Sequence, residues 1–112
     1  MNNKDIIILK KILNEIQIIE SIILGLNLSL FLEDEKSKRA VCMTLINIGE
    51  LVKNLDDDIR TQNKNIPWRE ISGMRDIAAH KYQTLKMERV WNTVNKDIPE
   101  FKKHLGKILA GV

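Results

Sequence analysis

Apolar residues recur every three or four positions along most of this chain, which is the pattern of amphipathic α-helices. The clearest stretch is residues 5–24, and the same spacing returns over 35–55, 68–80 and 86–109. The 112 residues include only five glycines and two prolines, which is little material for the turns of a β-fold. The pattern therefore predicts an all-α fold, an up-and-down bundle of four to five helices.

Breaks in the periodicity mark the connections between these helices. Gly25 and Asn27 end the first helix, and residues 29–32 form at most a short helical turn. Residues 56–65 are polar and predict a connection that contains one short helical turn. Pro99 interrupts the last stretch and predicts a kink or a break near residues 96–97. No composition shift or linker divides the chain, so we expect a single domain over residues 1–112.

The charge and the cysteine and histidine content narrow the class of protein. A net charge of +3 and a pI near 9.1 are compatible with a nucleic-acid ligand, although the surplus is modest. One cysteine and two histidines cannot form a usual zinc site, and Cys42 lies in an apolar run that predicts burial. Charged residues interrupt the first helix, so it is neither a signal peptide nor a membrane span. We expect a cytoplasmic protein without a membrane partner.

The first helix carries more apolar residues than one core contact requires. Ile6, Ile7, Ile18 and Ile22 widen its apolar stripe beyond the residues at core spacing. A second covered face would account for this width, and another copy of the chain is the simplest cover. The excess therefore predicts a homodimer to which the first helix contributes.

Four chemically active side chains gather in residues 73–82, namely Arg75, Asp76, His80 and Tyr82. A guanidinium binds phosphate through two nitrogens, and a histidine transfers protons near neutral pH. Five residues separate Arg75 from His80, which is about 140° around an ideal helix and about 7.5 Å along it. A helix that ends at His80 would let both reach one cleft, and its dipole would favour the protonated imidazole.

This pair of residues is suited to the cleavage of RNA without a metal ion. His80 would take the proton of the ribose 2′-hydroxyl or supply one to the leaving 5′-oxygen, while Arg75 stabilises the charge on phosphorus. One histidine cannot do both in one step, and a symmetric dimer would supply a second motif. A lone arginine or histidine at a helix end is more often a cap or a surface residue. Glu50 lies on or beside the apolar stripe of the helix predicted over residues 35–55. A residue at the boundary between core and solvent is favoured there over a partner of Arg75.

The spacing Arg-x4-His-x-Tyr and its surroundings resemble the HepT-like toxin branch of the HEPN superfamily. Further stretches of the chain also resemble landmarks of this family at the expected places, so the resemblance covers essentially the whole chain: 31–35, 48–50, 66–76 and 90–99. The resemblance implies a dimeric helical bundle and a metal-independent RNA endonuclease. Arg75 and His80 fall on the catalytic pair of the family. Asp76 takes a supporting position where asparagine is commoner, and an acid there would repel RNA phosphate.

The resemblance also implies a partner protein and a control mechanism. Tyr82 matches the tyrosine to which a small MNT nucleotidyltransferase, the antitoxin, attaches AMP by using ATP and Mg²⁺. A bulky anion beside His80 would block the cleft and repel RNA. The chain itself would need no cofactor and no metal, and it lacks a glycine-rich phosphate loop for the transfer.

Two other functions stay open at this level. The chain could be a non-catalytic subunit of a two-component nucleotidyltransferase, in which the same cleft binds a nucleotide or docks the partner. It could also be a toxin whose cleavage Asp76 has weakened.

Overall fold

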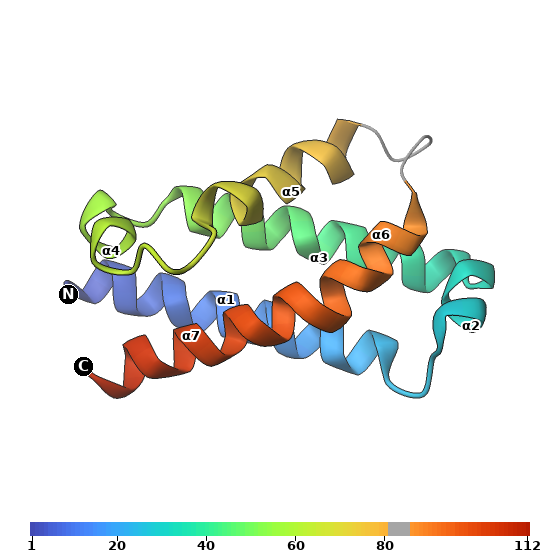
Figure 1. Cartoon of the computed structure of the whole chain (residues 1–112), viewed down its shortest axis with the longest axis horizontal. Helices are drawn as coiled ribbons and strands as arrows, with labels where there is room; N and C mark the ends of the chain where they lie inside the picture. Colours follow the sequence, from blue (N-terminus) through green and yellow to red (C-terminus); the bar gives the residue numbers. More distant parts are fainter. Residues whose placement is uncertain (81–85) are drawn as a thin grey trace.

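All secondary structure in the part of the chain that we describe is helical (Figure 1). The computed structural model describes residues 1–80 and 86–112, with the backbone alone for residues 76–80. The elements are α1 (Asn3–Ile23), α2 (Leu28–Glu33), α3 (Glu35–Lys53), α4 (Asp57–Gln62), α5 (Trp68–His80), α6 (Met87–Asn92), the π-helix η2 (Thr93–Asp97) and α7 (Ile98–Ala110). This architecture confirms the predicted all-α bundle.

The long helices run side by side along the 42 Å axis of the molecule. Helix α3 is the central element, because α1 packs on one side of it and α5 on another (Figure 1). Helix α7 completes the bundle against α1, and the two chain termini lie at the same end. The two short helical turns predicted from the sequence are present as α2 and α4. No helix in the described ranges is long and apolar enough to cross a membrane.

Side-chain caps set the starts of the helices. The side chain of Asn2 accepts a hydrogen bond from the Asp5 backbone N–H at 2.8 Å, so α1 starts two residues earlier than its apolar periodicity predicts. Asn27 and Asp34 cap α2 and α3 in the same way. Gly25 follows α1 with a φ of 79°, a conformation that glycine adopts without strain.

The hydrophobic core lies between α1, α3 and α7. Phe31 on α2 is fully buried in this core. The other fully buried residues are apolar and belong to the three helices: Leu9, Ile12, Ile16, Ile19, Val41, Ile48, Val52, Ile98, Phe101 and Leu105. Cys42 is buried among them, as predicted, and burial raises the pKa of its thiol to about 11. This cysteine is therefore a core residue and not a nucleophile.

The predicted break before Pro99 is the π-helix η2. There the Ile98 N–H donates to the carbonyl of Thr93, five residues back, in place of the usual four. Proline has no N–H to donate, and its ring crowds the carbonyl four residues before it. A wider turn accommodates this crowding, so the helical direction continues from α6 into α7 without a loop.

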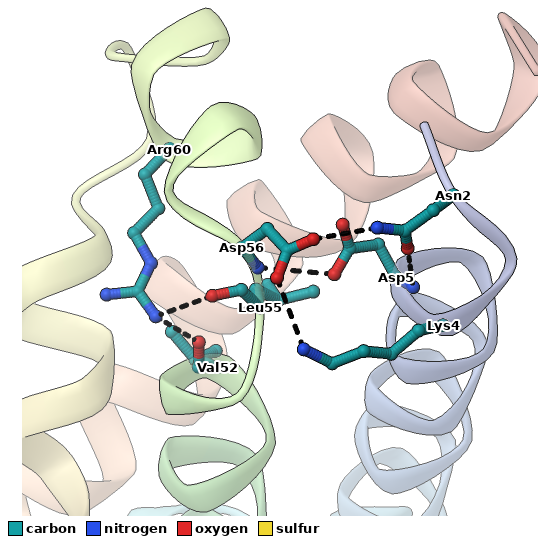
Figure 2. Close-up of polar contacts among 7 residues, drawn as sticks. All are labelled: Asn2, Lys4, Asp5, Val52, Leu55, Asp56 and Arg60. Atoms are coloured by element: carbon teal, nitrogen blue, oxygen red, sulfur yellow. Dashed lines mark hydrogen bonds and ion pairs between the residues drawn. The ribbon is translucent and has the colours of Figure 1, made fainter.

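A polar corner ties the start of α1 to the connection between α3 and α4 (Figure 2). Asp5 is only 2% exposed, and its carboxylate accepts the Asp56 backbone N–H at 3.2 Å. The Asp56 carboxylate accepts hydrogen bonds from Asn2 at 2.7 Å and from Lys4 at 3.2 Å. Through these bonds two segments that are about fifty residues apart in the chain hold each other in place.

The side chain of Arg60 caps the C-terminal end of α3 next to this polar corner (Figure 2). One of its terminal nitrogens donates to the carbonyls of Val52 at 2.7 Å and of Leu55 at 3.3 Å. The Val52 carbonyl lies in the last turn of α3 and the Leu55 carbonyl just beyond it, where the helix dipole favours a cation. The cap explains why α3 ends at Lys53, slightly before the predicted boundary.

Candidate functional site

Helix α5 carries the motif and is anchored firmly at its start. The indole N–H of Trp68 donates to the Asn63 carbonyl at 3.0 Å, and its ring meets Phe101 edge to face with centroids 5.8 Å apart. Ile71 is 2% exposed. The bundle therefore fixes the start of α5. Arg75 follows Ile71 by one helical turn.

The helix continues without interruption from Trp68 to His80, the last residue described before residue 86. Arg75 and His80 thus lie on one helix, about 140° apart around its axis by ideal geometry. The predicted helix end at His80 lies at the limit of the described residues and stays a prediction. The side chains of Asp76 and His80, and the whole of Tyr82, are outside the part of the chain that the structure describes.

Gly49 allows α5 to lie directly on α3. A Cβ atom at this position would lie 2.6 Å from Cβ of Arg75, 3.1 Å from the Ser72 carbonyl oxygen and 3.2 Å from the Arg75 nitrogen. Only a residue without a side chain permits this approach. Helical periodicity alone does not indicate which helix approaches Gly49, and the structure identifies it as the motif helix.

Glu50, the next residue of α3, forms an ion pair with Arg75 between Oε1 and Nε. The preferred interpretation of Glu50 as a mere boundary residue was wrong, and the alternative, a partner of the motif arginine, is what the structure contains. The Arg75 side chain is 34% exposed and that of Glu50 is 48% exposed. The pair therefore lies at the surface, where a large polymeric ligand can reach it.

A groove of about 330 Å³ opens between α1 and α3 beside this pair. Glu50 belongs to its lining, together with Lys11, Asn14, Glu15, Asn47 and Leu51. Asn47 donates to Glu15 across the groove at 2.8 Å. The Arg75–Glu50 pair and the α1–α3 face are thus neighbours.

Large apolar side chains on the same two helices are exposed to solvent. Ile7 is 53% exposed, Ile18 is 40% exposed and Met43, on α3, is 58% exposed. Ile7 and Ile18 are eleven residues apart, which places them on one side of α1. Exposed apolar surface of this kind is typical of a contact face between proteins.

Other polar features of the described residues lie away from the motif. His104 on α7 contacts Glu100 at 3.5 Å and Asn65 at 3.2 Å. A cavity of about 590 Å³ lies at the end of the molecule that holds both termini. Among the described residues, no group of three or more His, Cys, Asp or Glu side chains could hold a metal ion.

A helical bundle whose motif arginine and motif histidine lie on one helix has the architecture of the HEPN class. The chain belongs to the HepT-like ribonuclease family, since the family model described as "Ribonuclease HepT-like" matches residues 12–108. The resemblance found in the sequence is thereby confirmed.

Individual relatives agree with this assignment. The chain is 37% identical over 101 residues to a protein of Caldanaerobacter subterraneus subsp. tengcongensis named "Putative RNase", covering 90% of each chain. It is 36% identical over 100 residues to the "Probable ribonuclease HepT" of Thermococcus cleftensis, covering 89% of this chain and 91% of that protein. No solved structure matches the chain significantly.

Proposed function

We propose that this protein is the toxin of a toxin–antitoxin pair and an RNA endonuclease that works without a metal ion. The observation that carries the proposal is the placement of Arg75. Its side chain is accessible and paired with Glu50, and it lies on the same helix as His80. Membership in a ribonuclease family supports RNA as the substrate. Arg75 and His80 are the residues to which we assign the chemistry.

The reaction that suits these side chains is an internal transfer at phosphorus. The ribose 2′-oxygen attacks the adjacent phosphorus while the bond from phosphorus to the 5′-oxygen breaks. The 2′-hydroxyl proton is taken up by a base, and an acid supplies a proton to the departing 5′-oxygen. The products are a 2′,3′-cyclic phosphate and a 5′-hydroxyl. Arg75 stabilises the negative charge that develops on the phosphoryl oxygens.

His80 is suited to the acid step, because at the predicted end of α5 the helix dipole stabilises its protonated form. A base is needed as well, and a homodimer would bring the motif of a second copy. The exposed Ile7, Ile18 and Met43 beside the groove support a dimer through the α1–α3 face. Each site would then be built by two copies of the chain.

Control by the partner follows from Tyr82, which follows the helix by two residues in the sequence. In this proposal a small MNT nucleotidyltransferase uses ATP and Mg²⁺ to attach AMP to the Tyr82 hydroxyl. The added phosphate is negative and close in sequence to His80, so it repels the RNA backbone. The transfer chemistry belongs to the partner, and this chain supplies the acceptor.

A substrate with a single reactive position tests the mechanism. A DNA strand that contains one ribonucleotide should be cut only after that residue, in EDTA, with a 5′-hydroxyl on the downstream product. Cutting at deoxynucleotides, or a requirement for added metal, would contradict the proposal. Tight binding of the strand without any cutting would favour the non-catalytic binding subunit.

Asp76 allows the weakened-toxin alternative to be examined with the same substrate. Asparagine removes the negative charge next to Arg75 and keeps a polar side chain of similar size. Faster cleavage by Asp76→Asn would mean that the acid limits activity, whereas unchanged or reduced cleavage would count against a weakened toxin.

A further inference from the structure

We propose that Glu50 is a positioning residue for the cleavage reaction, acting through Arg75 and not by contact with RNA. The inference rests on the proposed function of Arg75 as the group that stabilises charge at phosphorus. Its basis is the ion pair between the Glu50 carboxylate and Nε of Arg75, made next to the close contact of Gly49 with Arg75.

The neighbouring glycine makes the contact possible. Arginine has a long side chain with many rotamers, and holding it in one of them costs conformational entropy. Gly49 brings the α3 backbone against Cβ of Arg75, so the base of the arginine is fixed by packing. Glu50, one residue later, then fixes the far end through Nε. The Gly49-Glu50 step thus holds both ends of the same side chain.

The Glu50 carboxylate paired with Nε restricts the orientation of the guanidinium group. All nitrogens of this group lie in one plane, and recognition of a phosphate by two nitrogens depends on the orientation of that plane. Small errors in the placement of a catalytic group cost large factors in rate. Glu50 therefore acts on the rate of the chemical step.

Neither stability nor RNA affinity explains a carboxylate at this position. The side chains of Arg75 and Glu50 are both more than a third exposed, and exposed ion pairs contribute little to stability. A negative charge beside a phosphate-binding arginine also opposes RNA binding. The expected signature of Glu50 is consequently a loss of rate without a loss of affinity, which a purely structural residue would not give.

The test compares Glu50→Gln with Glu15→Gln. Both residues line the groove between α1 and α3 and both substitutions remove one negative charge, but Glu15 contacts Asn47 and Glu50 contacts Arg75. We expect Glu50→Gln to lower kcat by about 10- to 100-fold. Its Kd for an all-deoxy, uncleavable strand should stay equal or fall. Glu15→Gln should leave kcat within about twofold of wild type, and Glu50→Asp should recover part of the lost rate.

A second readout does not depend on cleavage. The ¹⁵N chemical shift of Arg75 Nε should be the same in the wild type and in Glu15→Gln, and should change in Glu50→Gln, which removes the charge paired with it. A wild type that cleaves RNA no faster than Glu50→Gln does would overturn the role of Glu50 alone. A wild type that cleaves no RNA would overturn the proposed function, and the role of Glu50 with it.

Discussion

Gly49 of the central helix lies directly against Arg75 of the motif helix, with only 2.6 Å between Cβ of Arg75 and the position that a Cβ of residue 49 would take. No ordinary side chain fits there without moving α5. Gly49 therefore matters for the site as well as for the fold. It allows α3 to lie close to α5, next to the position where Glu50 forms its ion pair with Arg75.

Substitution of Gly49 by alanine should harm both stability and activity. We expect a loss of about 1–3 kcal/mol in the free energy of unfolding, since the added methyl group meets the backbone and Cβ of α5. Gly106 on α7 is the control, because a Cβ there meets nothing within 4 Å. Gly106→Ala should stabilise the protein by about 0.5–1 kcal/mol. Denaturant unfolding of the two variants measures both values, and a stable, active Gly49→Ala would contradict this account.

The sequence predicts the helices well and the contact between them poorly. Periodic apolar residues locate α1, α3 and α5, and Pro99 locates the interruption at η2. The pairing of Glu50 with Arg75 depends on the register of α3 against α5, which periodicity within one helix does not determine. Helix α1 starts two residues before its apolar periodicity because Asn2, an ordinary capping residue, sets its start.

Low pH should weaken the hydrogen bonds that the Asp56 carboxylate accepts from Asn2 and Lys4 at the start of α1. The hydrogen bond from Asn2, and then the one from Lys4, lower the pKa of Asp56 below its ordinary value of 3.8. A lowered pKa in the folded state means that charged Asp56 stabilises the protein above about pH 4, and that this contribution is lost as the pH falls through the folded-state pKa. Unfolding curves between pH 7 and pH 2 should show this loss.

Asp56→Asn isolates that contribution. The variant should be less stable than wild type at pH 7 and should show a shallower fall in stability below pH 4. Asp58→Asn removes the same charge from the first turn of α4, where the Asp58 side chain has no hydrogen bond or ion pair with a described residue, and it should keep the wild-type acid response. Equal pH profiles for Asp56→Asn and wild type would show that the corner carries no such linkage.

The α1–α3 face should hold two copies of the chain together. Sedimentation at micromolar concentration should find a dimer for the wild type and a monomer for Ile18→Glu, because a charge would be buried in an apolar contact. Leu30→Glu on α2 places the same charge on another exposed apolar residue and should remain dimeric. A monomeric wild type would remove the dimer and the composite site together.

Tyr82 should be the acceptor of AMP. It is the only tyrosine of the chain, so intact mass with fragment mapping identifies its modification without ambiguity. Incubation with the MNT partner, ATP and Mg²⁺ should add AMP to the wild type and abolish RNA cleavage. Tyr82→Phe should gain no mass and stay active in the same mixture. AMP on another residue, or modified protein that cleaves at the full rate, would disprove this mode of control.

The most direct measurement is cleavage of a mixed RNA in EDTA by purified wild-type protein and by His80→Ala. Intact mass must first show that Tyr82 is unmodified, and circular dichroism that both proteins are helical. We predict that only the wild type cleaves the RNA, with or without added metal ions. Equal cleavage by His80→Ala would contradict the assignment of His80. Absence of cleavage by either folded protein would contradict the nuclease itself and favour a binding subunit.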